Sequence, residues 1–338
     1  MFTARHALLA LFALLPLGAA QADEAAEKRA RAEDDKGTFS ILYENDKIGG
    51  TDQQYTNGFR AAYLSSTGGV PEWLRGVRPW LVPALDDDGA MRVGFALGQN
   101  LYTPNNTDRT TLDPRDRPYA AWTYATVSLV TDTGSRLDTV ALDIGVVGPA
   151  AYGEQVQNNV HRLINVATSQ GWANQIKNEP GVNLVWQRKW RLAPQPLWGD
   201  FGVDMTPMVG ASLGNVFTHA TAGAAFRFGQ DLSADYGPPR IRPSVAGSDF
   251  YRTNSGWGWY LFAGFEGRAV ARDIMLDGNT FRDSHSVDKE VLVGDAQLGF
   301  AILYEAIRFA FTFDMRTREF AGQNENVRFG AISLSTRF

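Results

Sequence analysis

Cysteine is absent from all 338 residues, and histidine is scarce, with four copies. The missing cysteine excludes a disulfide framework and any thiolate zinc site. Only three histidines follow the N-terminal leader, and no two of them (His161, His219 and His285) have the spacing of helical metal ligands, so zinc is not expected. An excess of positive charge is also lacking, because 32 basic residues face 37 acidic ones. Nucleic acid is therefore not an expected partner.

Long apolar runs are missing as well, apart from one at the N-terminus. The apolar stretch from Ala7 to Ala20 follows Arg5 and ends at the small-residue sequence Ala20-Gln21-Ala22. This pattern predicts a secretory signal peptide over residues 1–22. Residues 23–36 are charged and rich in alanine, which favours a solvated lead-in segment. No later segment has the roughly 18 apolar residues that a spanning helix requires.

Alternation with a period of two takes the place of apolar runs. Phe39, Ile41 and Tyr43 share one face of a strand, while Ser40 and Glu44 lie on the other. Similar segments recur through residues 37–338 and predict an all-β fold, an antiparallel transmembrane β-barrel of about twelve strands. The expected strands span 38–46, 56–65, 91–101, 118–131, 136–147, 181–192, 200–213, 217–229, 257–271, 290–303, 306–319 and 328–338.

A membrane location explains the two faces of these strands. Their polar face carries Arg, Asp, Glu, Ser and Gly, which suits a polar barrel interior with the apolar face toward lipid. A soluble sandwich would also alternate. The leader, the terminal Phe338 and the aromatic residues near strand ends, typical of interfacial girdles, favour the bacterial outer membrane. The expected girdle residues are Tyr102, Tyr119, Trp122, Trp186, Trp190, Trp257 and Trp259.

Strand direction assigns the connections to the two sides of the membrane. With a periplasmic N-terminus, the segments 46–55, 102–117, 148–180 and 272–289 are expected outside the cell, and short turns such as 132–135 in the periplasm. The long segment 230–256 then falls in the periplasm, where the sequence gives it no role.

One external segment loses the period of two. Between residues 153 and 168, Val156, Val160 and Leu163 fall at helical spacing, which predicts a short external helix packed on the barrel rim. Gln157 and His161 are four residues apart and project from the same side. An imidazole titrates near neutral pH, so His161 is a candidate general base. A surface histidine on a polar helix face is the alternative.

Hard oxygen donors gather at the first external hairpin. Glu44-Asn45-Asp46 ends the first strand, and Tyr55-Thr56-Asn57-Gly58 opens the second. Calcium prefers carboxylate, amide and carbonyl oxygens, but the same residue types also dominate ordinary turns. Asn45 continues the lipid-facing register of its strand, as Gln99 does in the third, and outward amides at this level need polar partners.

A serine motif competes with this site. Gly210-Ala211-Ser212-Leu213-Gly214 matches the G-x-S-x-G pattern, whose serine acts as a nucleophile on a strand–turn–helix elbow. Ser212 lies in an alternating strand that no helical pattern follows. We therefore do not expect Ser212 to be a nucleophile.

These segments together resemble the lipid A 3′-O-deacylase family of Gram-negative outer membranes. The matching stretches are Glu44-Asn45-Asp46, Thr51-Asp52-x-x-Tyr55-Thr56-Asn57-Gly58, Gln99 to Pro104, Asp116 to Ala120, Asp143 to Pro149, Val156 to Gln175 and Gln187 to Trp190. They cover most of the first half of the mature chain in order. The second half matches only as alternating strands.

The resemblance implies a calcium-dependent hydrolase that cleaves the 3′-O-linked acyl ester of lipid A. It implies calcium ligands at Asn45, Asp46 and Thr56, with His161 activating water beside Gln157 and calcium as the oxyanion hole. A catalytic lysine of the family is missing from the loop Asn105 to Asp116, which offers Arg109 and Arg115 instead.

The expected partner is lipid A, or lipopolysaccharide, in the outer leaflet, and we expect a monomer. An outer-membrane phospholipase and a non-catalytic barrel or pore remain the alternatives at this point.

Overall fold

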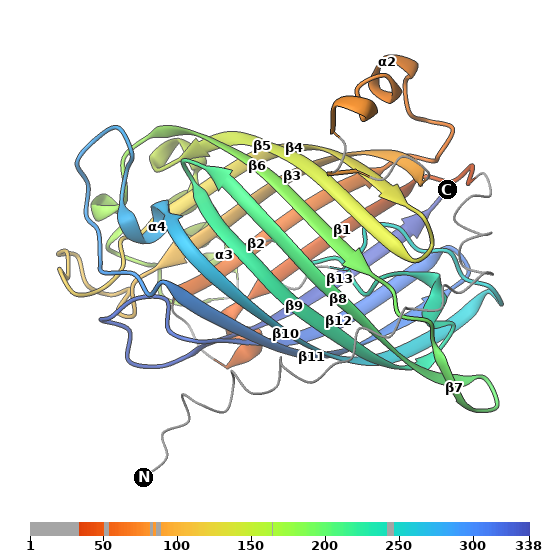
Figure 1. The fold of residues 1–338 in the computed structure, drawn as a ribbon. Helices are drawn as coiled ribbons and strands as arrows, with labels where there is room; N and C mark the ends of the chain where they lie inside the picture. The colour runs from red at the N-terminus through yellow and green to blue at the C-terminus, as the bar shows by residue number, and fades with distance from the viewer. Residues whose placement is uncertain (1–33, 51–53, 82–83, 86–88, 164, 242–246) are drawn as a thin grey trace, which may run out of the picture.

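The strands close into one antiparallel barrel (Figure 1). The computed structural model describes residues 34–50, 54–81, 84–85, 89–163, 165–241 and 247–338. Within them, each wall strand pairs with its neighbour in the chain, β1 pairs with β13, and the pairing of β6 with β8 completes the ring. The strands are β1 (Thr38–Asn45), β2 (Gln54–Leu64), β3 (Ala90–Thr103), β4 (Ala120–Asp132), β5 (Arg136–Val147), β6 (Glu179–Trp190), β7 (Gln195–Trp198), β8 (Phe201–Gly214), β9 (Phe217–Gln230), β10 (Trp257–Asp273), β11 (Leu292–Tyr304), β12 (Ile307–Arg316) and β13 (Val327–Arg337).

The predicted twelve-stranded barrel is confirmed. Each expected strand overlaps one wall strand, with ends that differ by three residues or fewer. The additional strand, β7, has four residues and forms a hairpin with the start of β8. It is too short to show a recognisable alternation in the sequence. The predicted signal peptide and nearly all of the lead-in segment lie outside the described residues.

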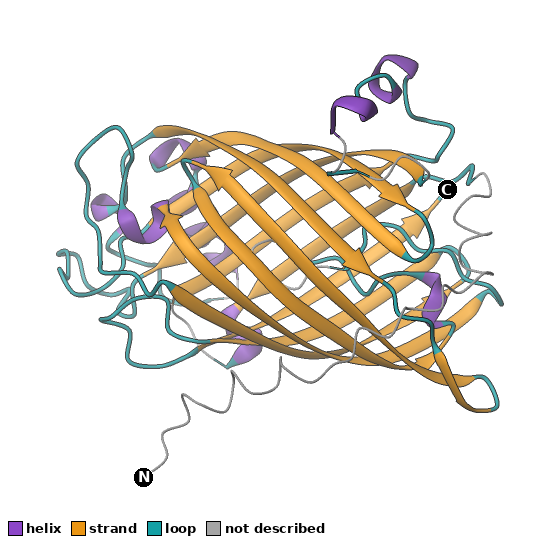
Figure 2. Cartoon of the chain, viewed as in Figure 1, coloured by secondary structure: helices purple, strands orange, loops and turns teal. Residues whose placement is uncertain are grey.

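The barrel has two unlike ends. At the terminal end, the first and last strands meet in the pair Thr38 and Arg337. This end also carries α2 (Glu72–Arg75) and β7, on the right of Figure 1. The opposite end, the loop end, carries α3 (Gly153–Leu163), α4 (Ile274–Asp277) and the 3-10 turn η2 (Asp46–Gly49). Figure 2 shows longer loops here than at most turns of the terminal end.

The outer surface of the wall is apolar, and the lumen is polar. Leu97, Phe265 and Leu298 project outward with 66%, 57% and 61% of their surface exposed. Glu266 and Gln297, which are adjacent in the chain to Phe265 and Leu298, are buried inside. This is the polarity of a barrel surrounded by lipid. None of the helices in the described part of the chain is both long and apolar enough to cross a bilayer.

The aromatic girdle was predicted only in part. Trp190 and Trp257 are exposed near strand ends, as a girdle requires. Tyr102, Tyr119 and Trp122 are instead nearly fully buried, and the Trp122 ring stacks on Tyr124 beside the lumen at a centroid distance of 5.4 Å. A position near a strand end does not decide whether the side chain faces lipid or protein, so the sequence alone could not separate the two groups.

The connection between β9 and β10 enters the barrel. This lumen segment, by which we mean the described residues 231–241 and 247–256, leaves and rejoins the wall at the terminal end, yet its side chains bond to the inner faces of several strands. Arg60 of β2 forms a bidentate ion pair with Asp249, with N–O distances of 2.9 and 3.0 Å. Tyr236 donates to Asp132 of β4 at 2.7 Å. The periplasmic position predicted for this segment from the sequence is wrong. Charged side chains in the lumen need buried partners, and the segment supplies them.

Asp235 is the most heavily bonded residue of the lumen segment. Its carboxylate accepts from Arg227 at 2.7 Å, from Arg308 at 2.9 Å and from the Tyr260 hydroxyl at 2.8 Å. All four side chains are buried. One carboxylate therefore joins β9, β10 and β12 from inside the barrel.

Removal of this carboxylate should destabilise the barrel. Asp235→Ala leaves two guanidinium groups with less buried countercharge, which typically costs about 3–5 kcal/mol of unfolding free energy. Urea titration monitored by tryptophan fluorescence should show a lower midpoint. The control is Asp113→Ala, whose ion pair with Arg109 lies in an exposed loop and should leave the midpoint unchanged. Equal midpoints for both variants would contradict this role of Asp235.

Candidate active site

A cleft on the outer side of the wall lies between strands β1 to β3 and helix α3. It is lined by Tyr43, Asn45, Lys47, Thr56, Asn57, Leu101, Val156, Gln157, Val160 and His161. The first external hairpin and the external helix therefore face one another. Of the five candidate site residues from the sequence, four line this cleft. The fifth, Asp46, is adjacent to Asn45 but fully buried.

Helix α3 turns its polar side toward the barrel. Gln157 and His161 are 3% and 5% exposed, while Val160 and Leu163 are 37% and 85% exposed. A soluble protein would bury the apolar stripe instead. The arrangement suits a helix whose outer face meets lipid. The predicted helix over 153–168 is too long, because Asn165 adopts the left-handed conformation with φ of 57° and ends it.

His161 is oriented by the backbone that follows the helix. Its Nδ1 lies 2.6 Å from the carbonyl oxygen of Ala167. A carbonyl can only accept, so we assign the proton to Nδ1, which leaves the lone pair of the neutral ring on Nε2. The chain therefore supplies a fixed imidazole with a basic nitrogen at the cleft.

Gln157 is held by a buried indole. Trp172 donates from Nε1 to Gln157 Oε1 at 2.7 Å, and the Trp172 ring packs on Tyr119 with centroids 4.9 Å apart. Burial raises the pKa of Tyr119 to about 12, so its hydroxyl stays protonated and donates to Thr107. With Oε1 occupied, Gln157 Nε2 has no partner among the described residues and remains a donor at the cleft. No role for Trp172 was predicted from the sequence, although it lies within the matching stretch 156–175.

A β-bulge brings Thr56 to the outer face. The pairing of β2 with β3 skips from Tyr55 to Asn57, so Thr56 is the extra residue. Tyr55 consequently points into the lumen, whereas Thr56 and Asn57 both line the cleft. Gly58 is required beneath the bulge, since a Cβ there would lie 2.1 Å from the Tyr55 hydroxyl.

Asn45 joins the two halves of the hairpin. Its Nδ2 donates to the Thr56 carbonyl at 2.8 Å, and its Oδ1 accepts from the Lys47 amide at 3.0 Å, capping η2. Asn45 does continue the outward register of β1, as predicted. Gln99 also faces outward, where it donates to the Ala151 carbonyl at 2.7 Å and so anchors the segment that leads into α3. Both outward amides thus have the polar partners that their position requires.

The loop arginines lie apart from the cleft lining. Arg109 pairs with Asp113 at 2.6 Å, and the Arg115 side chain is 88% exposed. Neither lines the cleft, whereas Lys47 does. Lys47 is therefore the cationic side chain among the lining residues, a position that the sequence did not single out.

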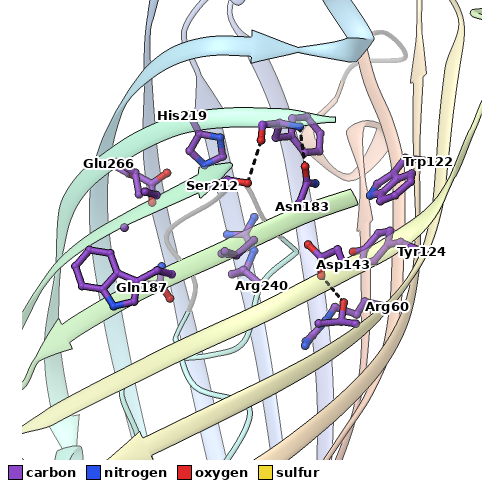
Figure 3. Close-up of a pocket in the computed structure, with 17 residues that line it drawn as sticks. Arg60, Trp122, Tyr124, Asp143, Asn183, Gln187, Ser212, His219, Arg240 and Glu266 are labelled. Atoms are coloured by element: carbon purple, nitrogen blue, oxygen red, sulfur yellow. Dashed lines mark hydrogen bonds between the residues drawn. The ribbon is translucent and has the colours of Figure 1, made fainter. Parts of the chain in front are cut away.

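Ser212 belongs to a separate cavity inside the barrel. It lies in β8, donates to the Phe217 carbonyl at 3.2 Å and is followed by β9, so no strand–turn–helix elbow forms. Figure 3 shows Ser212, His219 and Glu266 around this lumenal cavity. The expectation that Ser212 lacks the elbow geometry is confirmed.

Comparison with known proteins gives one family. Residues 7–338 match the family model described as outer membrane protein LpxR. The structure is similar to LpxR from Salmonella typhimurium, with a TM-score of 0.73 and 22% sequence identity over 88% of this chain and 99% of that chain. The β domain of the Bordetella autotransporter BrkA is less similar, with a TM-score of 0.40 and 9% identity over 91% of this chain and 99% of that chain. The search of curated proteins finds no match.

Loss of the indole hydrogen bond should loosen α3. Trp172→Phe keeps an aromatic ring against Tyr119 but leaves buried Gln157 Oε1 without its donor, a cost of about 1–3 kcal/mol. Trypsin should then cleave faster after the exposed Arg162 in α3. The control is Trp73→Phe, because Trp73 is 72% exposed on α2. Unchanged cleavage in Trp172→Phe would show that the bond does not restrain the helix.

Proposed function

The chain belongs to the LpxR family of outer-membrane lipid A deacylases, and from this premise we propose that it is a calcium-dependent hydrolase of the 3′-O-linked acyl ester of lipid A. The observation that carries the proposal is the meeting of His161 and Gln157 with Asn45 and Thr56 at one cleft. That cleft opens on the lipid-facing side of the wall, near the strand ends. An outer-leaflet lipid can reach it without leaving the membrane.

His161 has the geometry of a general base. Its Nδ1 donates to Ala167, so Nε2 can take a proton from water. The water oxygen then bonds to the ester carbonyl carbon, and the bond from that carbon to the sugar oxygen breaks. The proton on Nε2 passes to the departing alkoxide. The products are a free fatty acid and a sugar hydroxyl, and the imidazole returns to its neutral form.

Gln157 and Lys47 support this chemistry from the two sides of the cleft. Gln157 Nε2 offers a hydrogen bond to the attacking water or to the ester. Lys47 lines the cleft and provides a positive charge for an anionic lipid head. Lipid A carries such groups, and the loop after β3 contributes no lysine.

The donor atoms at the hairpin suit calcium chemically. Asn45 offers an amide oxygen, Asp46 a carboxylate, and Thr56 a hydroxyl and a carbonyl, all hard oxygens of the kind that calcium prefers. The described residues contain no cluster of three or more acidic, histidine or cysteine side chains that could hold a metal. An ion here would therefore rely on one carboxylate and neutral oxygens, so we expect modest affinity. When bound, calcium would stabilise negative charge on the ester oxygen.

A pore is a poorer interpretation. The lumen segment bonds to β2, β4 and β12 from inside, so the lumen is occupied by protein. A phospholipase would use the same chemistry on another lipid. Product analysis separates it from a lipid A deacylase.

Substitutions at the base and the hairpin test the enzyme hypothesis. His161→Ala should lower the deacylation rate about 10²- to 10⁴-fold, because the general base is lost. Asp46→Ala should abolish activity by removing the hairpin carboxylate. Mass spectrometry of lipid A from cells that express each variant measures the acyl pattern. A difference in gel mobility between heated and unheated samples verifies that each barrel folds.

The matched control is Ser212→Ala, which should retain full activity because Ser212 lies in the lumen. An unchanged acyl pattern with the wild-type protein would contradict the proposed function. Fatty acid released from phospholipid instead would identify a phospholipase.

Calcium removal is a separate test. A strong chelator should stop deacylation, and calcium should restore it better than magnesium, which demands a smaller octahedral set of ligands. Thr56→Val keeps the shape of the side chain but removes a donor, and it should raise the calcium concentration for half-maximal rate about tenfold. Activity that persists in the chelator would exclude calcium as the oxyanion group.

A further inference from the structure

The lumen segment reaches the back of the active-site hairpin. It starts from the terminal end, yet Arg240 bonds to side chains of β1, β11 and β12 inside the barrel. Its Nε donates to Glu44 at 2.9 Å, and its Nη1 donates to Gln297 at 2.9 Å and to Asp314 at 3.2 Å. Glu44 is the penultimate residue of β1, and Asp314 is two residues from the end of β12. The segment therefore reaches the level at which β1 ends and the hairpin begins.

Glu44 accepts hydrogen bonds from both the lumen segment and the hairpin. Its Oε1 accepts from Arg240 and from the Ile241 amide at 3.2 Å, while its Oε2 accepts from the Tyr55 hydroxyl at 2.9 Å. Glu44 is 1% exposed, Tyr55 3% and Arg240 4%. The three side chains form a buried triad, Arg240–Glu44–Tyr55, on the lumenal face of β1 and β2. Figure 3 shows Arg240 projecting into the cavity on this side of the wall.

Each wall residue of the triad precedes a residue of the cleft. Glu44 is followed by Asn45 and Asp46, and Tyr55 is followed by Thr56. In a strand, adjacent side chains point to opposite faces, and the bulge keeps Tyr55 inside and Thr56 outside. A bond that fixes Glu44 or Tyr55 in the lumen thus fixes the backbone from which the outer donors project.

The packing around the triad leaves little freedom. Tyr55 lies edge-on to Phe329 of β13 at 5.0 Å, and Arg240 lies over the same ring at 5.7 Å. Ile241 fills the space above Gly58, where a Cβ would approach its Cδ1 to 2.9 Å. Rigid support behind a site is what holds its ligands in the productive geometry.

We propose that Arg240 is a positioning residue for the active site, acting across the barrel wall through Glu44 and Tyr55. It touches neither substrate nor metal. It holds the hairpin that carries Asn45, Asp46 and Thr56. The link to catalysis rests on the proposed function, whereas the link to hairpin order does not.

Arg240→Met tests the proposal, since it keeps much of the side-chain volume and removes the guanidinium. Hydrogen exchange with mass spectrometry on the full-length protein in detergent should show faster exchange over residues 44–50 and 54–57. Calorimetric titration with calcium alone should show binding weakened about 10- to 100-fold, the usual effect of losing a supporting partner. The deacylation rate at low calcium should fall by a similar factor and recover partly at high calcium. Arg240→Lys, which keeps the charge, should restore part of each property.

The matched control is Arg308→Met. It makes the same change at another buried bond between the lumen segment and the wall, but Arg308 is the second residue of β12, at the terminal end. It should leave hairpin exchange and calcium binding at wild-type values.

These measurements distinguish failure of the positioning role from failure of the proposed function. Wild-type hairpin exchange in a folded Arg240→Met barrel would overturn the proposal, and so would equal effects of Arg308→Met, which would indicate general loosening. If the wild-type protein neither binds calcium nor deacylates lipid A, the proposed function fails. Faster hairpin exchange in Arg240→Met alone would still support the positioning role.

Discussion

The alternation of side chains along a β-strand is the constraint on which this structure depends. The wall is one strand thick, so a residue bonded in the lumen and a residue on the outer face are joined by a single peptide unit. Glu44 and Asn45 are such a pair. The bulge at Thr56 modifies the rule at one point, because it turns two successive side chains, Thr56 and Asn57, to the outside. An outward cluster of polar donors is then possible on a wall that is otherwise apolar.

The surroundings of the barrel explain why the external helix has an unusual polarity. Lipid does not penalise exposed Val160 and Leu163, but it leaves outward amides without hydrogen bonds. The polar side of α3 therefore packs over the polar part of the wall. Gln99 anchors the preceding segment, and Trp172 holds Gln157. Together these contacts produce a cleft between the helix and the hairpin whose lining combines polar side chains with apolar ones such as Leu101 and Val156. This suits a substrate with a charged sugar head and acyl chains.

Much of the fold could be predicted from the sequence because alternation is a local signal. The period of two predicts the twelve wall strands. The spacing of four residues predicts that Gln157 and His161 share one side of the helix. The path of residues 231–256 could not be predicted, since the partners of Arg240 and Asp235 lie on strands distant in sequence. The bulge at Thr56 was missed because one extra residue hardly changes a hydrophobic pattern. The helix end at Asn165 and the lumenal position of Trp122 depend on backbone conformation and three-dimensional packing in the same way.

A segment of the chain that enters the lumen places charged side chains behind the wall. A guanidinium with three hydrogen-bonded partners, such as Arg240, is a stiff support, because its planar fork fixes the directions of the bonds. In the positioning role proposed for Arg240, a segment that enters from one end of the barrel restrains a hairpin at the other.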